Sequence, residues 1–261
     1  MLKMSGSANT NNVDGGGDIR QQKQVLRKQI RSRLRSAYPS SKNENDNDVS
    51  DNNLLTKSNQ VFAQLYNLPQ YQAASTIGFF ISMPHGEIQT RDAIRHIITK
   101  DKKTLYVPRV GLDFELCDMD LICCTDNHHD GDVSSSRSSS SSQEDDELFY
   151  DHWPRNKWGI PEPPITDANK IATPGDIDLL IVPGLAFDSN KHRMGQGKGY
   201  YDRFIAKMRQ EKGQGGATAA TVKKPLLVGV CLEEQFLVDE TIPISEHDFI
   251  MDMVLTPSKK V

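Results

Sequence analysis

One segment, residues 177–205, constrains the fold of this chain more than any other. It begins with Ile-Asp-Leu-Leu-Ile-Val, a mostly apolar run that Pro183 and Gly184 end, and this pattern predicts a buried strand followed by a turn. Three closely spaced glycines follow, and residues 200–205 have the pattern of a helix start. A strand, a glycine-rich loop and a helix in this order present backbone N–H groups and a helix N-terminus to an anion.

The glycine-rich loop also carries two cations. Glycine, here at 195, 197 and 199, permits φ > 0 and lets the backbone approach a ligand closely. Arg193 adds positive charge as a planar fork and Lys198 as a point charge. The loop matches neither the P-loop nor the Gly-x-Gly-x-x-Gly pattern. It therefore indicates an anion-binding loop, and a flexible surface turn with incidental charges is the alternative.

Amphipathic helices and apolar strands alternate along the rest of the chain. We predict helices from Asp18, acting as N-cap, to about Ser36, from Leu54 to a residue before Pro69, and from about Thr90. We predict further strands at residues 75–81, 104–108, 114–121, 225–232 and within 245–256, the last at an edge. This alternation favours an α/β fold: a single-domain layered sheet, Rossmann-like, with helices on both faces and ligands beyond the C-terminal strand ends.

Three polar stretches interrupt this pattern. We predict that residues 1–17 are a disordered leader and that residues 41–53 are a loop. Residues 125–148 hold eight serines in the nine positions 134–142, so we predict a long disordered insertion there. His128 and His129 fall inside it, which argues against a metal site at these histidines. Without these stretches about 207 residues remain, which is enough for one domain over residues 18–261.

Composition argues against several classes of protein. A net charge of −4 gives no general attraction for nucleic acid, and no apolar run approaches the ~20 residues that span a bilayer, so neither partner is expected. The four cysteines show no C-x-x-C spacing, which argues against disulfides or zinc and favours a reducing, cytoplasmic location. Asp14 and Asp18 argue against a transit peptide, although a mitochondrial location stays open. We expect a monomer.

Several acidic residues fall at the expected C-terminal ends of the strands. These are Glu87, Asp202 at the end of the glycine loop, and Asp248. Asp202 and Asp248 can hold Mg²⁺, which takes one or two carboxylates together with substrate phosphates. A favourable charge at a helix N-terminus and an ordinary turn are the alternatives for these two aspartates. The residues alone thus predict an enzyme that acts on a nucleotide or another phosphate ligand.

Other residues admit two interpretations. The first predicted helix has an apolar stripe formed by Leu26, Ile30 and Leu34, and its many cations favour a solvated face. Tyr200 and Tyr201 diverge by about 100° on a helix, so one can pack inward while the other stacks on a flat ligand. Burial in the core is the alternative for both tyrosines and for Trp158.

The segment from Pro183 to Asp202 resembles the signature of the 5-formyltetrahydrofolate cyclo-ligases, also called methenyltetrahydrofolate synthetases. It contains Pro-Gly-Leu-Ala-Phe-Asp at 183–188 and Arg-Met-Gly-Gln-Gly-Lys-Gly-Tyr-Tyr-Asp at 193–202. The resemblance covers residues 20–256 apart from the polar insertions, and includes Lys23-Gln-Val-Leu-Arg27 and the segments 80–87, 108–109, 158–163 and 246–256. Met194 replaces the usual leucine, and the loop at 82–87 is one residue longer than the family form.

This resemblance implies that ATP and Mg²⁺ convert 5-formyltetrahydrofolate into 5,10-methenyltetrahydrofolate, with release of ADP and phosphate. Phosphorylation of the formyl oxygen would create a good leaving group, and the neighbouring folate nitrogen would then close the ring. Such a reaction needs mainly positioning and charge neutralisation. A catalytically inactive paralog, acting as a nucleotide- or RNA-associated accessory protein, is the alternative.

The resemblance also implies roles for individual residues. Arg193 and Lys198 would be the catalytic residues that stabilise the transferring phosphoryl group. The nucleotide would be bound by Lys23, Arg27, Arg193, Gly195, Gln196, Gly197, Lys198, Gly199, Tyr200 and Tyr201. The folate would be bound by Arg27, Ile81, Met83, Glu87, Trp158 and Tyr201. Asp202 and Asp248 would hold the metal.

Overall fold

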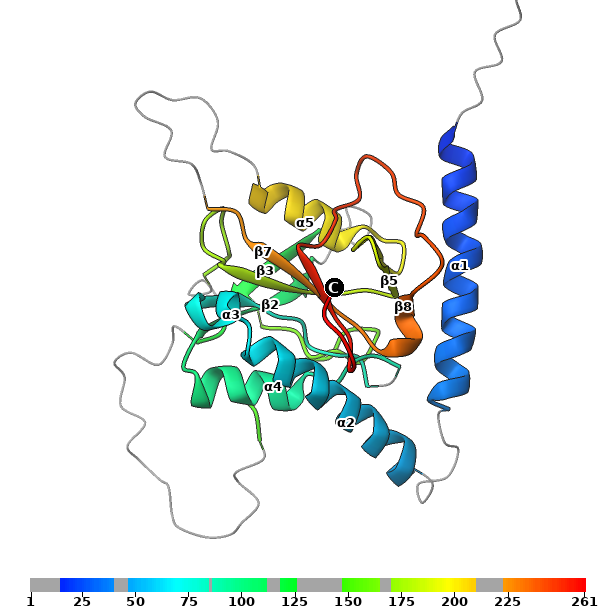
Figure 1. The fold of residues 1–261 in the computed structure, drawn as a ribbon. Helices are drawn as coiled ribbons and strands as arrows, with labels where there is room; N and C mark the ends of the chain where they lie inside the picture. Colours follow the sequence, from blue (N-terminus) through cyan, green and yellow to red (C-terminus); the bar gives the residue numbers. More distant parts are fainter. Residues whose placement is uncertain are drawn as a thin grey trace, which may run out of the picture.

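The computed structural model describes residues 15–39, 47–84, 86–111, 118–125, 147–164, 170–209 and 223–261 (Figure 1). Its helices and helical turns are α1 Gly15–Ala37, α2 Asn47–Tyr66, α3 Pro69–Ala73, α4 Arg91–Arg95, the π-turn η1 His96–Lys100, α5 Tyr200–Arg209 and the 3₁₀ turn η4 Glu233–Gln235. Its strands are β1 Thr76–Gly78, β2 Thr104–Val110, β3 Met119–Cys123, β4 Leu179–Pro183, β5 Ala186–Asp188, β6 Arg193–Met194, β7 Leu226–Val230, β8 Phe236–Leu237 and β9 Met253–Leu255. None of the helices in these ranges is both long and apolar enough to cross a bilayer.

A six-stranded sheet in the order β3-β2-β1-β4-β7-β9 forms the centre of the molecule. β1 runs parallel to β2 and β4, β4 to β7, and β7 to β9, whereas β2 and β3 are antiparallel. β4, in the middle, is buried from Leu179 to Val182, as expected when both faces of a parallel sheet are covered. β9 lies at an edge, as predicted from the sequence.

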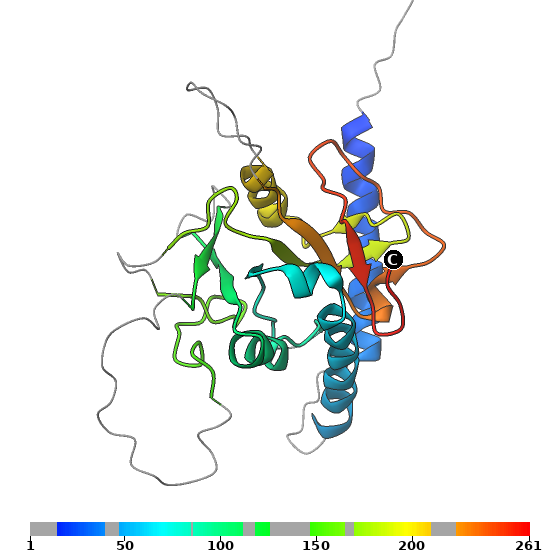
Figure 2. The ribbon, with the colours of Figure 1, turned by 60° about the vertical axis from the view of Figure 1, so that its left-hand side comes forward.

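Side chains that alternate along β4 pack into two different cores. Leu179 and Ile181 belong to the core that includes residues of α1, α2 and α4. Leu180 and Val182 belong to the core that includes Phe204 of α5. Accordingly, α5 lies on one side of the sheet and α2, α3 and α4 lie on the other (Figures 1 and 2). This arrangement confirms the predicted α/β layering with helices on both faces.

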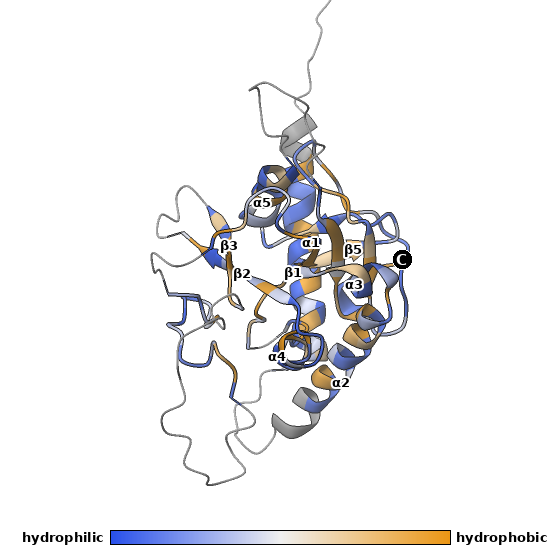
Figure 3. Cartoon of the chain, turned by 90° about the vertical axis from the view of Figure 1, so that its left-hand side faces the viewer, coloured by the Kyte–Doolittle hydropathy of each residue, from blue (hydrophilic) through white to orange (hydrophobic). Residues whose placement is uncertain are grey.

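The first two helices are amphipathic as predicted, but both begin earlier than expected. Leu26, Ile30 and Leu34 of α1 are 8 %, 0 % and 7 % exposed, and hydrophobic and hydrophilic segments alternate along α2 (Figure 3). α1 begins at Gly15, so the assignment of Asp18 as N-cap is wrong. α2 begins at Asn47, within the predicted loop. Helix starts were misplaced because the apolar period, which signals a helix, begins only after the first turns. Residues 1–14 and 40–46 lie outside the described part of the chain.

The strands also differ in detail from the prediction. β1 has three residues instead of the seven expected at 75–81. β3 lies slightly beyond the expected 114–121, of which residues 114–117 are outside the described ranges. A small second sheet, in the order β6-β5-β8, was not predicted at all. Its strands have two or three residues, too few for an alternating pattern to be recognised.

The predicted insertion at 125–148 is too long at both ends. Residues 126–146 lie outside the described ranges, so their predicted disorder stays a prediction. Thr125, however, accepts a hydrogen bond at its hydroxyl oxygen from the backbone N–H of Leu105, at 3.0 Å. Leu148 is 4 % exposed and belongs to the main core. Both end residues therefore belong to the folded domain.

We expect that replacing residues 127–145 by a short Gly-Ser linker leaves the melting temperature within about 3 °C of the wild-type value, because no residue of the described core is removed. Extending the deletion through Leu148 should cost about 2–5 kcal/mol, the range for loss of a large buried aliphatic side chain. Thermal unfolding of both variants beside the wild type measures these effects. A marked loss of stability in the shorter deletion would contradict the prediction.

Candidate active site

The order of the strands in the sheet reverses between the two central strands, β1 and β4. From β1 the chain passes to β2 on one side, whereas β4 is followed in the sheet by β7 on the other side. At such a switch point a crevice opens beyond the C-terminal ends of the strands, where α/β proteins bind ligands. A cavity of about 610 Å³ lies here, lined by Phe80 and Ile81 after β1 and by Pro183 and Gly184 at the end of β4.

All the site residues predicted from the sequence line this one cavity. They are Lys23, Arg27, Ile81, Met83, Glu87, Trp158, Arg193, Gly195, Gln196, Gly197, Lys198, Gly199, Tyr200, Tyr201, Asp202 and Asp248. These residues come from α1, from the loop after β1, from the segment before β4, from the β6–α5 region and from the loop before β9. The fold therefore brings the predicted nucleotide, folate and metal residues together.

The loop between β6 and α5 requires glycine at two positions. Gly197 has φ +103° and Gly199 has φ +70°, in the left-handed region that glycine tolerates. A Cβ atom at Gly197 would lie 3.3 Å from Cζ of Arg27, and one at Gly199 would lie 2.9 Å from Nη1 of Arg203. The loop thus packs closely against α1 and against the start of α5, while both glycines still line the cavity.

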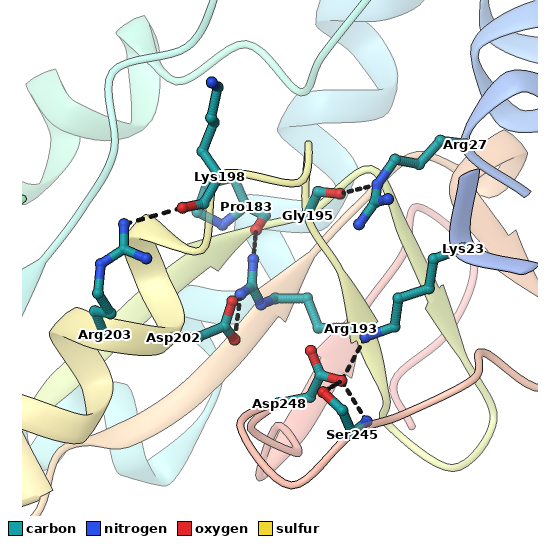
Figure 4. A network of polar contacts seen from close by, with 10 residues as sticks. All are labelled: Lys23, Arg27, Pro183, Arg193, Gly195, Lys198, Asp202, Arg203, Ser245 and Asp248. Atoms are coloured by element: carbon teal, nitrogen blue, oxygen red, sulfur yellow. Dashed lines mark hydrogen bonds and ion pairs between the residues drawn. The ribbon is translucent and has the colours of Figure 1, made fainter. Parts of the chain in front are cut away.

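Arg193, at the start of β6, is a buried cation in the wall of the cavity, with a side chain that is 4 % exposed. Its Nη2 donates to Oδ1 of Asp202 at 2.7 Å, and its Nη1 donates to the carbonyl oxygen of Pro183 at 3.4 Å (Figure 4). Its Nε is buried and has no hydrogen-bond partner in the described part of the chain. A buried donor without a partner suits an acceptor supplied by a ligand.

Lys23 of α1 forms an ion pair with Asp248, in the loop before β9 (Figure 4). Asp248 also accepts hydrogen bonds from the backbone N–H and the hydroxyl of Ser245, at 2.6 and 2.8 Å. Burial alone would raise the pKa of Asp248, but the hydrogen bonds from Lys23 and Ser245 outweigh burial and lower the pKa. Asp248 is therefore held as an anion beside the cavity.

Two more cations of α1 hold the glycine loop. Arg27 donates from Nε to the carbonyl oxygen of Gly195 at 3.0 Å, and Arg31 donates from Nη2 to Oε1 of Gln196 at 2.7 Å. Burial and the neighbouring charge of Arg31 lower the pKa of Arg27. Lys23, Arg27 and Arg31 thus line the cavity, and the prediction of a solvated face is wrong for these three residues of the first helix. The family resemblance had implied a binding role for Lys23 and Arg27 but not for Arg31.

Lys198 lies in the same loop and is exposed. Its carbonyl oxygen accepts a hydrogen bond from Nη2 of Arg203 at 2.9 Å, which holds the backbone in place. Its ammonium group has no acceptor among the residues that the structure describes. Figure 4 shows this side chain pointing away from the ion pairs of Arg193 and Lys23. The ammonium group is therefore available to an anionic ligand.

The loop after β1 contributes a carboxyl group to the cavity. Oε2 of Glu87 accepts a hydrogen bond from the backbone N–H of Met83 at 3.0 Å. Burial raises the pKa of Glu87 to about 7. Burial, together with the nearby Glu87, also raises the pKa of Tyr201. A carboxyl group that titrates near neutral pH, in a cavity also lined by apolar and aromatic side chains such as Trp158, can exchange hydrogen bonds with the ring nitrogens of a flat heterocycle.

The raised pKa of Glu87 makes stability depend on pH. Between about pH 4.5 and pH 7 the unfolded chain has lost this proton while the folded protein keeps it, so the free energy of unfolding falls as pH rises through this window. We expect the melting temperature of the unliganded wild type to fall relative to that of Glu87→Gln across the window, since glutamine does not ionise. Calorimetry of both proteins over this range measures the difference, and parallel curves would contradict the expectation.

The two candidate metal ligands are each paired with a cation. Asp202 contacts Arg193, and Asp248 contacts Lys23. Within the described ranges no group of three or more His, Cys, Asp or Glu side chains could hold a metal. Mg²⁺ is usually bound by one or two carboxylates together with substrate phosphates. The donor set therefore fits a magnesium ion that is bound together with phosphates, rather than one held by the protein alone.

Sequence reasoning missed part of the cavity wall. The missed residues are Arg31, Phe80, Pro108, Val110, Met119, Asn156, Ile160, Glu162, Pro183, Gly184, Leu185 and Met194. Arg31 could have been found, because it follows Arg27 by four residues and so lies on the same side of the helix. Asn156, which donates to Glu162 at 2.9 Å, is close in sequence to Trp158, but no spacing rule marks it as a site residue.

Comparison with known proteins identifies the family. The model of the 5-formyltetrahydrofolate cyclo-ligase family matches residues 19–257. The chain belongs to this family. A protein of Schizosaccharomyces pombe named a probable 5-formyltetrahydrofolate cyclo-ligase is 28 % identical over 213 residues, which cover 82 % of this chain and 90 % of the relative. The 5-formyltetrahydrofolate cyclo-ligase of Mus musculus is 29 % identical over 187 residues, which cover 71 % and 75 % of the two chains.

A solved structure supports the same conclusion for the fold. The 5,10-methenyltetrahydrofolate synthetase of Aquifex aeolicus has a TM-score of 0.59 and 22 % identity, over 91 % of each chain. This likeness confirms the α/β fold. Family membership and the curated relatives make the chain an enzyme of the ligase class with 5-formyltetrahydrofolate cyclo-ligase activity.

Proposed function

We propose that the enzyme uses ATP and Mg²⁺ to close 5-formyltetrahydrofolate into 5,10-methenyltetrahydrofolate, with release of ADP and phosphate. The observation that carries this proposal is that two different walls share one cavity of about 610 Å³. One wall has the glycine loop with Arg193 and Lys198, which suits phosphates. The other has Glu87 among apolar and aromatic side chains, which suits a flat heterocycle. A nucleotide and a folate can therefore meet in this space.

The nucleotide is assigned to the wall formed by α1 and the glycine loop. The unpartnered Nε of Arg193 and the ammonium group of Lys198 are donors that suit phosphate oxygens. The positive φ of Gly197 and Gly199 shapes the loop that lines this wall. Lys23 and the other α1 cations add positive charge along the same wall. We assign the folate to Arg27, Ile81, Met83, Glu87, Trp158 and Tyr201, all of which line the cavity.

The reaction proceeds in two steps in this proposal. In the first step the formyl oxygen attacks the γ-phosphorus of ATP, the bond to the bridging oxygen breaks, and ADP leaves. In the second step the neighbouring folate nitrogen attacks the activated carbon, the carbon–oxygen bond breaks, phosphate leaves, and the nitrogen loses its proton. Arg193 and Lys198 neutralise the charge on the transferring phosphoryl group, and the walls hold the two reactants together.

Asp202 and Asp248 are the residues that would hold Mg²⁺. When bound, the ion supplies charge neutralisation to the phosphates. Both carboxylates have cationic partners, Lys23 for Asp248 and Arg193 for Asp202, so the ion would have to share the carboxylates with these pairs. Lys23 and Arg193 would add positive charge beside the phosphates.

Absorbance tests the proposal, because methenyltetrahydrofolate has a near-ultraviolet band that its formyl precursor lacks. The purified full-length protein with 5-formyltetrahydrofolate, ATP and Mg²⁺ should develop this band and release ADP in equal amount. Omission of ATP, or chelation of the metal, should abolish both signals. If no band develops under any of these conditions, the proposal fails and the inactive-paralog alternative is favoured.

We further propose that the enzyme acts as a monomer in the cytoplasm. One chain supplies both the side of the cavity that we assign to the nucleotide and the side that we assign to the folate. In the described part of the chain Cys123, Cys124 and Cys231 are free thiols, which suits a reducing compartment. Sedimentation of the purified protein and fractionation of the source cells test the two statements separately.

A further inference from the structure

Asp188 ends the short strand β5, and its side chain is completely buried. It lines neither the active-site cavity nor a second cavity of about 290 Å³ that adjoins it. A buried carboxylate is tolerated in a fold only when its oxygens are paired with donors. The donors that surround Asp188 therefore show which parts of the chain it holds together.

Four donors in the described part of the chain contact the two oxygens of Asp188. Oδ1 accepts hydrogen bonds from the backbone N–H groups of Asn190 and His192, both at 2.9 Å. Oδ2 accepts from Nδ1 of His192 at 2.9 Å and from the backbone N–H of Ile242 at 2.8 Å. An ionised carboxylate has about four acceptor sites and no donor. Asp188 therefore uses its full capacity, and asparagine, which has the same shape, could not accept at all four sites.

The donors of Asn190 and His192 close the turn between β5 and β6. Two backbone hydrogen bonds add to this closure: the N–H of Lys191 donates to the carbonyl oxygen of Asp188 at 3.0 Å, and the N–H of Asp188 donates to that of His192 at 3.3 Å. Arg193 follows the turn directly and begins β6. The buried guanidinium group of the active site thus extends from a backbone that Asp188 holds in place.

The fourth donor belongs to the segment between β8 and β9, which carries Asp248. The β5–β6 turn holds this segment on both sides of Asp248. Before it, the N–H of Ile242 donates to Asp188, and after it, the N–H of Met251 donates to the carbonyl oxygen of Lys191 at 3.0 Å. Ile242 and Met251 are each 1 % exposed, so both attachments are buried. Asp248 therefore lies in a loop whose two ends are attached to the same turn.

We propose that Asp188 is a positioning residue for the active site, because its carboxylate joins the backbone of Arg193 to the loop of Asp248. Both Arg193 and Asp248 line the cavity. A displacement of about 1 Å can cost a reaction that depends on positioning roughly 10²-fold in rate. This inference rests on the proposed function, which assigns Arg193 to the phosphoryl group and Asp248 to the magnesium ion.

The main test compares Asp188→Asn with Asp178→Asn in the full-length protein. Asp178 is the matched control, because it precedes β4 at the end away from the cavity and lines neither cavity. It too holds backbone, since it accepts from the N–H groups of Ser75 and Thr76 at 2.7 and 3.0 Å, and from Nζ of Lys223 at 2.6 Å. Both variants keep the shape of the side chain and replace one acceptor by a donor. We expect both to lower the melting temperature by about 2–10 °C.

The reaction itself should change only in Asp188→Asn. We expect kcat to fall about 10- to 10²-fold, because Arg193 loses its support. The Mg²⁺ concentration for half-maximal activity should rise roughly 10-fold, because the loop of Asp248 is released. Asp178→Asn should keep both quantities near their wild-type values. Wild-type kcat and Mg²⁺ dependence in Asp188→Asn would overturn the proposal, as would equal changes in the two variants.

Two variants of His192 provide a milder change that leaves the three backbone donors of Asp188 in place. The ring is 13 % exposed and supplies one of the four hydrogen bonds. His192→Ala should lower kcat less than Asp188→Asn does. His192→Asn should restore most of this loss, because an asparagine amide can donate from about the position of Nδ1. If Asp188→Asn does not fold, His192→Ala decides, and a wild-type kcat in that variant would overturn the proposal.

Hydrogen exchange without ligands separates the role of Asp188 from the proposed function. The backbone N–H groups of Ile242 and Met251 should exchange faster in Asp188→Asn than in Asp178→Asn, because only the first variant releases the loop. Absence of ATP-dependent turnover in the wild type would refute the proposed function, yet this difference in exchange would remain. Normal turnover in both variants, with equal exchange of these groups, would overturn the role of Asp188 alone.

Discussion

Replacement of Lys198 by alanine should lower kcat by about 10²-fold or more and leave the melting temperature close to the wild-type value. Removal of one preorganised charge that stabilises a transition state costs about this much. The side chain is exposed and its ammonium group has no acceptor in the described part of the chain, so its loss removes no hydrogen bond or ion pair from that part. Steady-state kinetics by methenyltetrahydrofolate absorbance, together with thermal unfolding, measure the two quantities.

Lys224→Ala is the matched control for this variant. Lys224 is also exposed, and it lines neither cavity. Both lysine variants remove one positive charge from a surface position, so a general effect of net charge would appear equally in the two. We expect near-normal kcat for Lys224→Ala. A near-normal kcat for Lys198→Ala would refute its catalytic role, and a fall of many degrees in its melting temperature would indicate a structural role instead.

Arg193→Lys should lower kcat by about 10²- to 10³-fold although the charge is kept. Lysine lacks the planar fork with which Arg193 binds Asp202 and the carbonyl oxygen of Pro183. It also lacks the unpartnered Nε that we assign to a phosphate oxygen. Because the site is buried, weakening of these hydrogen bonds should also lower the free energy of unfolding by about 1–3 kcal/mol.

Arg209→Lys separates the catalytic effect from the structural one. Arg209, near the end of α5, resembles Arg193 in its surroundings: it pairs with an aspartate, Asp252, at 3.6 Å, its Cζ lies 5.6 Å from the centre of the Phe249 ring, and its buried Nε has no hydrogen-bond partner in the described ranges. It does not line the cavity. We expect a loss of stability in both variants and a loss of kcat only in Arg193→Lys. Similar kcat values in the two would assign the effect of Arg193 to stability alone.

The layered fold could be predicted because burial leaves a pattern in the sequence. A helix that buries one face shows the helical period of apolar residues, and a strand that is buried on both faces is a continuous apolar run. Leu26, Ile30 and Leu34 recur at the helical period, and the run at 179–182 is continuously apolar. The small sheet gives no such signal in the sequence. Its strands are short, and β5 pairs with β8, which lies far away in the chain, so that Phe187 is opposite Phe236. Leu148 was assigned to the insertion because a single apolar residue beside a polar run gives no period, although it packs into the core.

Many of the residues that line the cavity could be predicted, but their partners could not. The residue types and the family resemblance predicted Asp202 and Asp248 as metal ligands, yet only the structure shows that Arg193 and Lys23 pair with them. Burial of Glu87, which raises its pKa to about 7, follows from how the loop after β1 packs and not from any local pattern. Such pairings depend on the relative placement of segments that are far apart in the chain.

The ion pair between Lys23 and Asp248 joins residues 225 positions apart, and a ligand in the cavity would contact both ends of the folded domain. Such a ligand binds the native chain and not its unfolded ensemble, so it stabilises the whole fold by mass action, by about 2.7 kcal/mol at a concentration 100 times Kd. With nucleotide and folate as the proposed ligands, their cellular supply would govern how often the protein unfolds and is exposed to proteolysis. Starvation for either metabolite would shorten the lifetime of the enzyme as well as slow its turnover.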